Sequence, residues 1–544
     1  MHSRAVFLSA LALTVNAANI QKPGLVQPSD SATHAQDAIN VFKAAYADYK
    51  KYAWGHDSLA PISKAPVDDR NGWGATIVDA MSTAKVMGLD DIFNEAANFS
   101  SKIDFSKSKT SDNVSVFETT IRFLGGLISA YELDGKKNRA LIDKAKQVAD
   151  KMAFAWVGAN DFPYNSQNFG TNKPVIEQSG IAVAGTLVLE WAKLSDYTGN
   201  QTYRQLVEKS MRRIGTNAAP LPGLPAQGID PTTGKPVGDY ITWGGGSDSY
   251  FEYLIKYGRI TNNKDTVWTS RWLTAVDSSI RYLAQTAVNT TVPNLLYLGD
   301  YTGGRVRHIG SHLACFHGGN WIMGGRLTNN QTIVDYGLRL TEACWNTYQK
   351  TATGIGPEVF AYIGPDGSYN GGVTPGQTDL DFYNKNGFYV YNNYAYYDLR
   401  PEVLESNFYA WRATGDIKYY NRAVAGLESI KKYCRPGVGV AGFNDVRSTS
   451  SGYIDHTESF FFAEVMKYIY LTFADPSVIN LDKYVINTEA HPFEAPAALS
   501  SYQPPVRASV GGQLPSKTWS GFIPQISSVR GVAKKLSDIL NQVV

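Results

Sequence analysis

The sequence of 544 residues has few cysteines, no long apolar run beyond its first residues and no excess of charge of one sign. Lys and Arg number 51 and Asp and Glu number 49, which gives a formal net charge of +2. Proteins that bind nucleic acid normally carry a basic stripe or patch, so nucleic acid is not expected as a partner. No later stretch reaches the roughly 20 apolar residues that a membrane-spanning helix needs. The mature protein is therefore expected to be soluble, without a membrane anchor.

The N-terminus is typical of a secretory signal peptide. His2 and Arg4 form a short polar region, residues 5–15 form an apolar run too short to span a bilayer, and residues 15–17 have the small-residue pattern of a cleavage site. We therefore predict that residues 1–17 are a signal peptide and that the protein is secreted. A secreted chain can be glycosylated at its Asn-x-Ser/Thr sequons, which are Asn98, Asn113, Asn200, Asn289 and Asn330.

The chain contains only three cysteines. In an oxidising compartment one pair is expected to form a disulfide and one thiol to stay free. Cys315 and Cys344 are nearest in sequence and lie in successive predicted helices, which favours that pair and leaves Cys434. No Cys-x-x-Cys spacing suggests a zinc site. A zinc site at His308 and His312, four residues apart, is a minor alternative.

One local pattern recurs six times along the chain: a helix ends at a short Gly/Asn/Asp turn, and an amphipathic helix follows. The copies begin at Val86, Glu132, Asp196, Arg259, Arg326 and Arg412. A seventh helix pair is predicted from the two ends of the chain, residues 37–52 and 458–473. Repeated helical hairpins form either an open solenoid or a closed α/α barrel. The long loops at 218–250 and 355–393 favour a closed barrel with one decorated rim.

Seven carboxylates lie just inside these predicted helices among apolar residues: Glu118, Asp248, Glu402, Glu405, Glu458, Glu464 and Glu489. One buried carboxylate is usually a structural ion pair or cap, but seven at comparable places would ring one end of a barrel. Such an acidic pit suits glycoside hydrolysis by inversion, in which a protonated carboxyl and a carboxylate lie about 6.5–9.5 Å apart. Oxygen ligands also suit a hard cation such as calcium. The residues alone predict a glycosidase or an acidic metal-binding barrel.

Several motifs in fixed order resemble glycoside hydrolase family 47, the class I α-mannosidases. They are FETTIRFLGGLISAYEL, SDSYFEYLIKYG, HLACF, LRPEVLESNFYAWRATGD, ESFFFAEVMKYIYLTF and VINTEAHP. The resemblance is to the secreted filamentous-fungal branch and implies an all-α fold, an (α/α)7 barrel, as a catalytic domain over residues 35–492. Residues 493–544, which begin rich in Pro, Ser and Gly, are predicted to form a C-terminal tail. A monomer is expected.

The resemblance implies an inverting exo-glycosidase that hydrolyses terminal α-1,2-linked mannose from high-mannose N-glycans or glycoproteins. Glu118 and Asp248 are the two candidates for the general acid, and Glu402 corresponds to the general base. Thr488 is implied to hold a calcium ion (Ca2+) through its hydroxyl and carbonyl oxygens. The implied substrate-binding residues are Arg122, His312, Glu405, Glu458, Phe460, Glu464 and Glu489. Cys315 and Cys344 match the disulfide of the family.

Some features leave alternatives open. Many members of the family carry an acid shortly before the Thr-Leu of IAVAGTLVLEWAKLSDYTGN, where Val183 stands here, although Glu190 remains. Trp73 is equally compatible with core packing and with stacking on sugar, and Arg122 is placed for an ion pair with Glu118. Two rival functions are a non-catalytic mannose-binding protein, which would lack an acid or base, and a glucoamylase-like barrel of six hairpins, which would lack NTEAHP.

Overall fold

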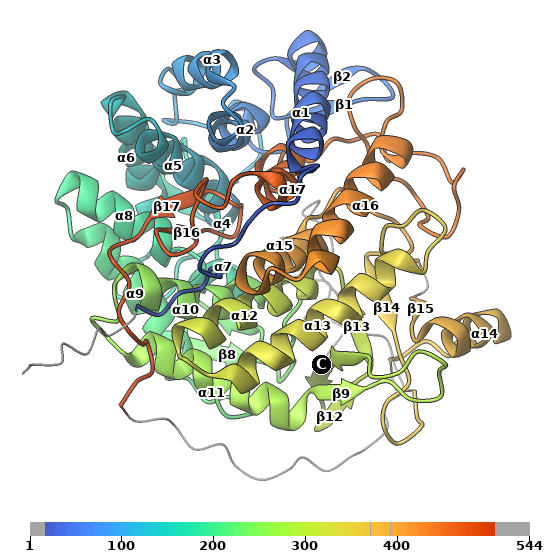
Figure 1. Cartoon of the computed structure of the whole chain (residues 1–544). Coiled ribbons are helices and arrows are strands. Elements are labelled where there is room, and N and C mark those ends of the chain that lie inside the picture. Colours follow the sequence, from blue (N-terminus) through green and yellow to red (C-terminus); the bar gives the residue numbers. More distant parts are fainter. Residues whose placement is uncertain (1–16, 370, 392, 506–544) are drawn as a thin grey trace, which may run out of the picture.

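The structure, a computed structural model, describes residues 17–505 except residues 370 and 392, and consists mainly of two concentric rings of helices (Figure 1). In this part of the chain the outer ring contains α1 (Ser31–Ala53), α3 (Asp90–Ser100), α6 (Arg139–Met152), α9 (Thr202–Ile214), α11 (Val267–Tyr282), α13 (Gln331–Gln349) and α16 (Ile417–Tyr433). The inner ring contains α2 (Ala75–Val86), α5 (Gly125–Leu133), α8 (Val188–Thr198), α10 (Asp248–Ile260), α12 (His317–Leu327), α15 (Glu402–Thr414) and α17 (Met466–Phe473). The predicted all-α (α/α)7 barrel is confirmed.

The two rings differ in how their helices bury residues. Helix α15 is buried on all sides from Glu402 to Ala413, as expected of a helix inside a core. Helix α6 buries only one stripe, which includes Leu141, Ala145 and Val148, and exposes its polar face. Because an outer helix such as α6 has one buried apolar face and one exposed polar face, its 3.6-residue pattern and the turn before it could be recognised in the sequence.

The ring closes where the two ends of the described chain meet. Helix α1 packs against α17, and α2 packs against the π-helical segment η4 (Phe461–Val465) that precedes α17 (Figure 1). Nearby, the amide of Ala18 donates to the carbonyl of Leu499 at 2.8 Å. The predicted seventh pair, formed from the ends of the chain, is therefore confirmed.

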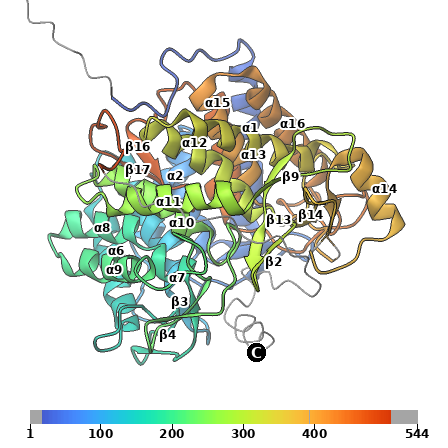
Figure 2. The ribbon, with the colours of Figure 1, turned by 90° about the horizontal axis from the view of Figure 1, so that it is seen from below.

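Short antiparallel strands decorate the loops between the helices. The pairs and triplets are β1 (Ser58–Ala60) with β2 (Ala65–Val67); β3 (Val114–Ser115), β4 (Ser166–Asn168) and β5 (Lys173–Pro174); β6 (Ser179–Gly180), β7 (Gly228–Asp230) and β8 (Lys235–Val237); β9 (Ala284–Thr286) with β10 (Leu296–Leu298); β11 (Asp300–Thr302) with β12 (Arg305–Arg307); β13 (Ile309–Ser311), β14 (Val359–Ala361) and β15 (Tyr389–Val390); and β16 (Tyr484–Ile486) with β17 (Pro492–Glu494). Five short helices and turns complete the loops: α4 (Val116–Glu118), η2 (Ala153–Ala155), α7 (Ile181–Gly185), η3 (Leu313–Phe316) and α14 (Gln377–Asn386). Figure 2 shows β3 and β4 at the opposite end of the barrel from β16 and β17.

The turn between β16 and β17, residues 487–491, reaches into the barrel. Asn487 donates from Nδ2 to the carbonyl of Ile121 at 3.1 Å, within the π-helical segment η1 (Thr119–Leu124). Lys467 donates from Nζ to the carbonyl of Ala490 at 2.7 Å. A Cβ at Gly125 would lie only 2.7 Å from Asn487 Nδ2. The glycine therefore makes room for the turn beside the inner helices.

Two predicted segments lie partly outside the described residues. The predicted signal peptide falls on residues 1–17, of which residue 17 alone is described, and the predicted tail is described only as far as residue 505. Within that tail, Tyr502 is fully buried and donates its hydroxyl to Asn262 Oδ1 at 2.5 Å. The chain up to this point thus packs against the barrel. None of the described helices has the length and apolar character needed to cross a membrane.

Candidate active site

The predicted carboxylates gather at the end of the barrel where the inner helices begin. Asp248 is the first residue of α10, Glu402 is the first residue of α15, and Glu118 ends α4 directly before η1. The negative charge of Glu402 raises the pKa of Asp248, so these two groups are close. The charges of Glu489 and Glu402 likewise raise the pKa of Glu464 in η4. The structure therefore brings together side chains that are separated by up to 371 positions (118 to 489) in the sequence.

Two arginines lie on one side of this acidic pit. Arg122 donates from Nε to Glu118 Oε2 at 2.8 Å, which confirms the predicted ion pair. Its Nη1 contacts Glu489 and lies 3.4 Å from Asp79 Oδ2. Arg70 Nε lies 3.6 Å from the same Oε2 atom of Glu118. One oxygen of Glu118 thus has two guanidinium groups beside it.

A buried histidine completes the positive side of the pit. His456 Nε2 lies 2.9 Å from Asp69 Oδ2, and its Nδ1 lies 3.3 Å from Glu458 Oε1. Burial lowers the pKa of His456, but the carboxylates of Glu458 and Asp69 outweigh this and raise it to about 10. For Glu458, burial raises the pKa, yet His456 and Arg70 together lower it to about 2. His456 and Arg70 therefore favour the ionised form of Glu458.

The side formed by α10 and α15 is different. Burial raises the pKa of Asp248 to about 7, and hydrogen bonds from Ser249 only partly oppose this. Within the described chain no ion pair is recorded for Asp248. Burial raises the pKa of Glu405 to about 8 although Lys256 is nearby. Carboxyl groups on this side can hold a proton near neutral pH.

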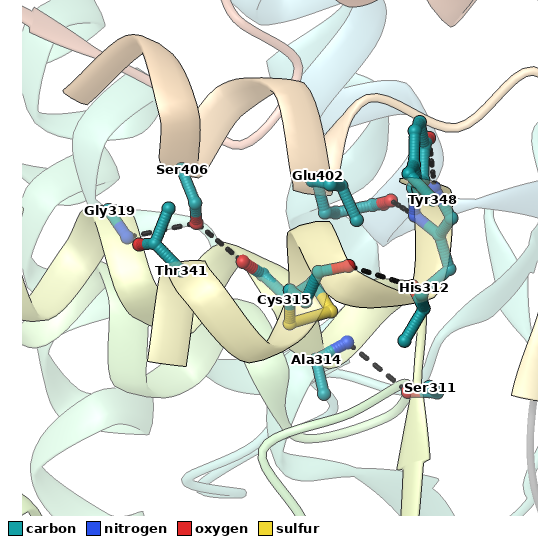
Figure 3. The surroundings of a disulfide bond; sticks show 12 residues. Ser311, His312, Ala314, Cys315, Gly319, Thr341, Tyr348, Glu402 and Ser406 are labelled. Carbon is teal, nitrogen blue, oxygen red and sulfur yellow. Dashed lines mark hydrogen bonds and ion pairs between the residues drawn. A yellow bond between two sulfur atoms is a disulfide. The ribbon is translucent and has the colours of Figure 1, made fainter. Parts of the chain in front are cut away.

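Glu402 is the exception on this side because a histidine lies behind it. His312 Nδ1 is 2.6 Å from Glu402 Oε2, and His312 Nε2 is 2.7 Å from the hydroxyl of Tyr348. Burial raises the pKa of Glu402, but the hydrogen bond with His312 and the charge of Arg400 lower it below its ordinary value. Glu402 is therefore suited to accept a proton. Both nitrogens of His312, a predicted glycan contact, are engaged by protein groups (Figure 3).

A disulfide lies directly beneath this group. Cys315 and Cys344 are bonded, with their Cα atoms 5.9 Å apart, which confirms the predicted pairing. Cys434 is the free, buried thiol of the described chain. The carbonyl of Cys315 accepts a hydrogen bond from Ser406, one turn after Glu402 on α15 (Figure 3). The disulfide and this hydrogen bond tie η3, α13 and α15 together.

The turn that carries Thr488 lies among buried oxygen atoms. The amide of Thr488 donates to the hydroxyl of Tyr253 at 3.3 Å, and that hydroxyl donates to Glu190 Oε1 at 2.5 Å. Burial raises the pKa of Glu190 to about 7, and burial together with neighbouring carboxylates raises the pKa values of Glu464 and Glu489 well above their usual range. In the described ranges no group of three or more His, Cys, Asp or Glu side chains is arranged to hold a metal. Oxygen atoms of the turn and water would have to complete a cation site.

Three further residues singled out in the sequence, Phe460, Val183 and Trp73, are all buried. Phe460 is buried, and its ring lies 5.6 Å from the guanidinium carbon of Arg122. Val183 is buried in α7. Trp73 is fully buried, and its ring packs edge-on against Phe123, with centroids 5.4 Å apart. Of the two roles open to Trp73, core packing is the one observed.

The sequence reasoning missed the charged partners of the acids. Asp69 and Arg70 lie in the loop before α2, Asp79 lies within α2, and His456 lies in the loop before η4. Asp69, Arg70 and His456 have no local sequence signal, because their partners lie far away in the chain: His456 and Asp69 are 387 positions apart. A buried-charge argument could have found Asp79, which lies among apolar residues of a fully buried helix.

Comparison with known proteins agrees with this architecture. Residues 41–495 match glycosyl hydrolase family 47. The probable mannosyl-oligosaccharide alpha-1,2-mannosidase 1B of Aspergillus clavatus is 40% identical over 494 residues, covering 86% of this chain and 94% of that protein. The mannosyl-oligosaccharide alpha-1,2-mannosidase 1B of Aspergillus oryzae is 37% identical over 521 residues, covering 90% and 99%.

A solved structure extends the agreement to three dimensions. The alpha-1,2-mannosidase from Trichoderma reesei is 35% identical and superposes with a TM-score of 0.82, covering 86% of this chain and 99% of that one. The family match spans most of the sequence and includes every carboxylate of the pit. This chain therefore belongs to glycosyl hydrolase family 47, a family of glycosidases.

Proposed function

We propose that this protein is an inverting exo-glycosidase that removes terminal α-1,2-linked mannose from high-mannose N-glycans. The names of its relatives support the substrate. One observation supports the mechanism: within one cluster of carboxyl groups, the pKa of Asp248 is raised to about 7 while that of Glu402 is lowered. Inversion needs one carboxyl that holds a proton and one carboxylate that accepts one.

The proposed reaction assigns one step to each of these groups. Asp248 gives its proton to the glycosidic oxygen as the bond from that oxygen to C1 breaks. Glu402 takes a proton from a water molecule whose oxygen bonds to C1 from the opposite face of the ring. The products are β-mannose and the shortened glycan, with Asp248 ionised and Glu402 protonated. Exchange of protons with solvent restores both groups.

Glu118 is the second candidate for the acid, acting through a water molecule. Its Oε2 atom accepts a hydrogen bond from Arg122 Nε at 2.8 Å and lies 3.6 Å from Arg70 Nε, so two guanidinium groups hold this side chain in place. This environment supports a role in orienting substrate or water beside Asp248. The remaining predicted subsite residues, including Phe460 and Glu405, would contact the terminal sugar.

We also propose that a calcium ion binds at the Thr488 turn. The surroundings fit a hard cation, because the donors are oxygen atoms and Glu464, Glu489 and Glu405 all carry carboxyl groups whose ionisation is opposed by burial. Thr488 would supply its hydroxyl and carbonyl oxygens. When bound, the ion would bind sugar hydroxyls and stabilise the ionised carboxylates nearby.

The predicted secretion and glycosylation remain proposals supported by the sequence. Glycosylation of a sequon needs its asparagine at the surface, because an attached glycan is bulky and hydrophilic. The side chains of Asn98, Asn113, Asn200 and Asn289 are exposed, and Asn330 is half-buried at the start of α13.

Product analysis tests the proposed function. The secreted protein is incubated with a high-mannose N-glycan and calcium, and products are followed by mass spectrometry and proton NMR. We expect single mannoses to be lost stepwise and to appear first as the β-anomer. Release of α-mannose would contradict inversion. Binding without cleavage would favour the non-catalytic mannose-binding alternative.

A further inference from the structure

A buried tyrosine lies behind the proposed base. Tyr348 is 1 % exposed, and its hydroxyl is 2.7 Å from Nε2 of His312. The other ring nitrogen of His312 is 2.6 Å from Glu402 Oε2. Tyr348, His312 and Glu402 come from α13, the loop before η3 and the start of α15. They form a continuous line of hydrogen-bonding atoms that ends at the proposed catalytic carboxylate.

The direction of these hydrogen bonds follows from the number of protons available. A neutral imidazole carries one N–H, and an ionised carboxylate can only accept. If Nδ1–H of His312 donates to Glu402, Nε2 must accept, and the hydroxyl of Tyr348 must donate to it. Burial raises the pKa of Tyr348 well above its ordinary value, so the hydroxyl keeps this proton. Without the donor, the proton of His312 can move to Nε2, which turns the lone pair of Nδ1 towards the carboxylate.

The local architecture holds this line of atoms in place. Cys315 follows His312 by three residues, Cys344 precedes Tyr348 by four, and the disulfide joins them. The two elements that carry His312 and Tyr348 are thus covalently tied about one helical turn from the hydrogen bond. The ring of Tyr397 lies 5.9 Å from that of His312 and limits its rotation (Figure 3 shows the other members of the group).

We propose that Tyr348 is a positioning residue for the hydrolytic reaction: its hydroxyl fixes the tautomer and orientation of His312, and His312 in turn fixes Glu402 as the acceptor of a proton from water. This inference rests on the proposed role of Glu402 as general base. Tyr348 touches neither substrate nor water in this scheme and acts only through His312.

Other charged and titratable groups also face the His312–Glu402 pair and must be kept constant in any test. They are Asp248 from α10, Glu405 from α15, Glu464 from η4, Glu358 from the end of the loop before β14, Arg400 and Asp398 from the loop before α15, and Tyr397 and Cys434 behind Tyr348. A substitution that removes only the hydroxyl of Tyr348 leaves all of these groups unchanged.

The test is a double-mutant cycle with Tyr348→Phe and His312→Asn, measuring kcat, KM, the pH profile of kcat/KM and the melting temperature. In Tyr348→Phe we expect kcat to fall about ten-fold or more, KM to change less than about two-fold, and the acidic limb of the profile to move to higher pH. The amide of Asn in His312→Asn can donate to Glu402 without any choice of tautomer. We therefore expect Tyr348→Phe to have no further effect in that background.

The matched control is Tyr420→Phe. Tyr420 is also buried, and its hydroxyl donates to a carboxylate, Asp30 Oδ1, at 2.8 Å, but it lies in the outer helix α16. Its kcat and pH profile should match those of the wild type.

Several results would overturn the inference. One is an unchanged acidic limb in Tyr348→Phe, and another is an equal loss of kcat with and without His312. Failure of Tyr348→Phe to fold would also overturn it, because the hydroxyl would then have a structural role. Glu402→Gln separates this inference from the function on which it rests. If Glu402→Gln is inactive and Tyr348→Phe is normal, only the role of Tyr348 fails; if Glu402→Gln is active, the role of Glu402 as base fails as well.

Discussion

Both sides of the acidic pit contain carboxyl groups, but the pKa values of two acids on one side and two on the other are shifted in opposite directions. On the side near α2 and η1, Arg70, Arg122 and His456 lie among the carboxylates, and the pKa values of Asp69 and Glu458 are lowered. On the side of α10 and α15, the pKa values of Asp248 and Glu405 are raised to about 7 and about 8. The cations beside Asp69 and Glu458 outweigh the effect of burial on these two acids, whereas burial outweighs the partners of Asp248 and Glu405.

This difference supports the proposal that one pit contains both a proton donor, Asp248, and a proton acceptor, Glu402. A nearby cation favours the carboxylate of a buried acid and burial favours the neutral carboxyl, so the balance of the two sets the direction of each pKa shift. Glu402 lies on the second side and yet has a lowered pKa, because His312 Nδ1 is in hydrogen-bond contact with its Oε2 atom at 2.6 Å and Arg400 is nearby. Variants that remove a single acid or a single cation on one side test this comparison directly.

The largest effect is expected for Glu402→Gln. Loss of the proton acceptor should lower kcat by roughly 10²–10⁴-fold, while the melting temperature changes little because the amide oxygen can still accept from His312. Rates on a mannose disaccharide are measured together with thermal unfolding. Glu428→Gln, in an exposed pair with Lys431, is the control. A normal rate in Glu402→Gln would remove Glu402 from the reaction.

The next effect separates the two candidate acids. Asp248→Asn should lower the rate about 100-fold on a disaccharide, and much less on a mannoside whose leaving group needs no protonation. Glu118→Gln should show the same loss on both substrates if Glu118 orients substrate. If the rate of Glu118→Gln, and not that of Asp248→Asn, recovers on the mannoside with the good leaving group, Glu118 is the general acid instead of Asp248.

On the side that has many cations, removal of one should mainly affect stability. Arg122→Met leaves Glu118, Asp79 and Glu489 without their common partner and should lower the free energy of unfolding by about 3–5 kcal/mol. Lys431→Met, in an exposed pair, should cost less than about 1 kcal/mol. Urea unfolding at pH 7 measures both. Equal effects would show that the arginine is not required by the buried carboxylates.

Calcium that binds at the Thr488 turn should stabilise the folded protein. At a hundred-fold excess over its dissociation constant, binding to the folded barrel alone stabilises it by about 2.7 kcal/mol. EDTA should therefore lower both the melting temperature and the activity, and calcium should restore both. Magnesium at the same concentration is the control. A melting temperature that ignores EDTA would contradict binding at Thr488.

The smallest and broadest effect is on stability as a function of pH. The folded pKa of Glu458 is about 2, below its ordinary value, so its contribution is present above about pH 4.5 and is lost as the pH falls. The folded pKa of Asp248 is about 7, above its ordinary value, so its contribution is present below about pH 4 and is lost as the pH rises through 7. Melting temperatures from pH 3 to pH 9 should decline at both ends. Asp248→Asn should weaken only the alkaline decline.

The sequence predicted those features that depend on neighbours in the chain. Regular turns revealed six helix pairs, the spacing of four residues revealed the contact of Arg122 with Glu118, and proximity favoured the pair Cys315–Cys344. The charge pattern of the pit could not be predicted in this way. Arg122 meets Ser459 at a separation of 337 positions, and Tyr348 meets His312 only because η3 and α13 pack together. Such contacts depend on the three-dimensional closure of the ring, which hydrophobic periodicity does not encode.

Closure of the ring by its first and last helices also has a consequence for synthesis. Arg122 leaves the ribosome long before Glu489, its buried partner 367 positions later. Six of the seven hairpins can assemble before the turn between β16 and β17, which carries Glu489, is available to Arg122. A growing chain therefore acquires its full set of carboxylates only when almost all of it has been made. Shortened chains that end before this turn should be incapable of hydrolysis, so that completeness of the polypeptide is a condition for activity inside the cell that makes it.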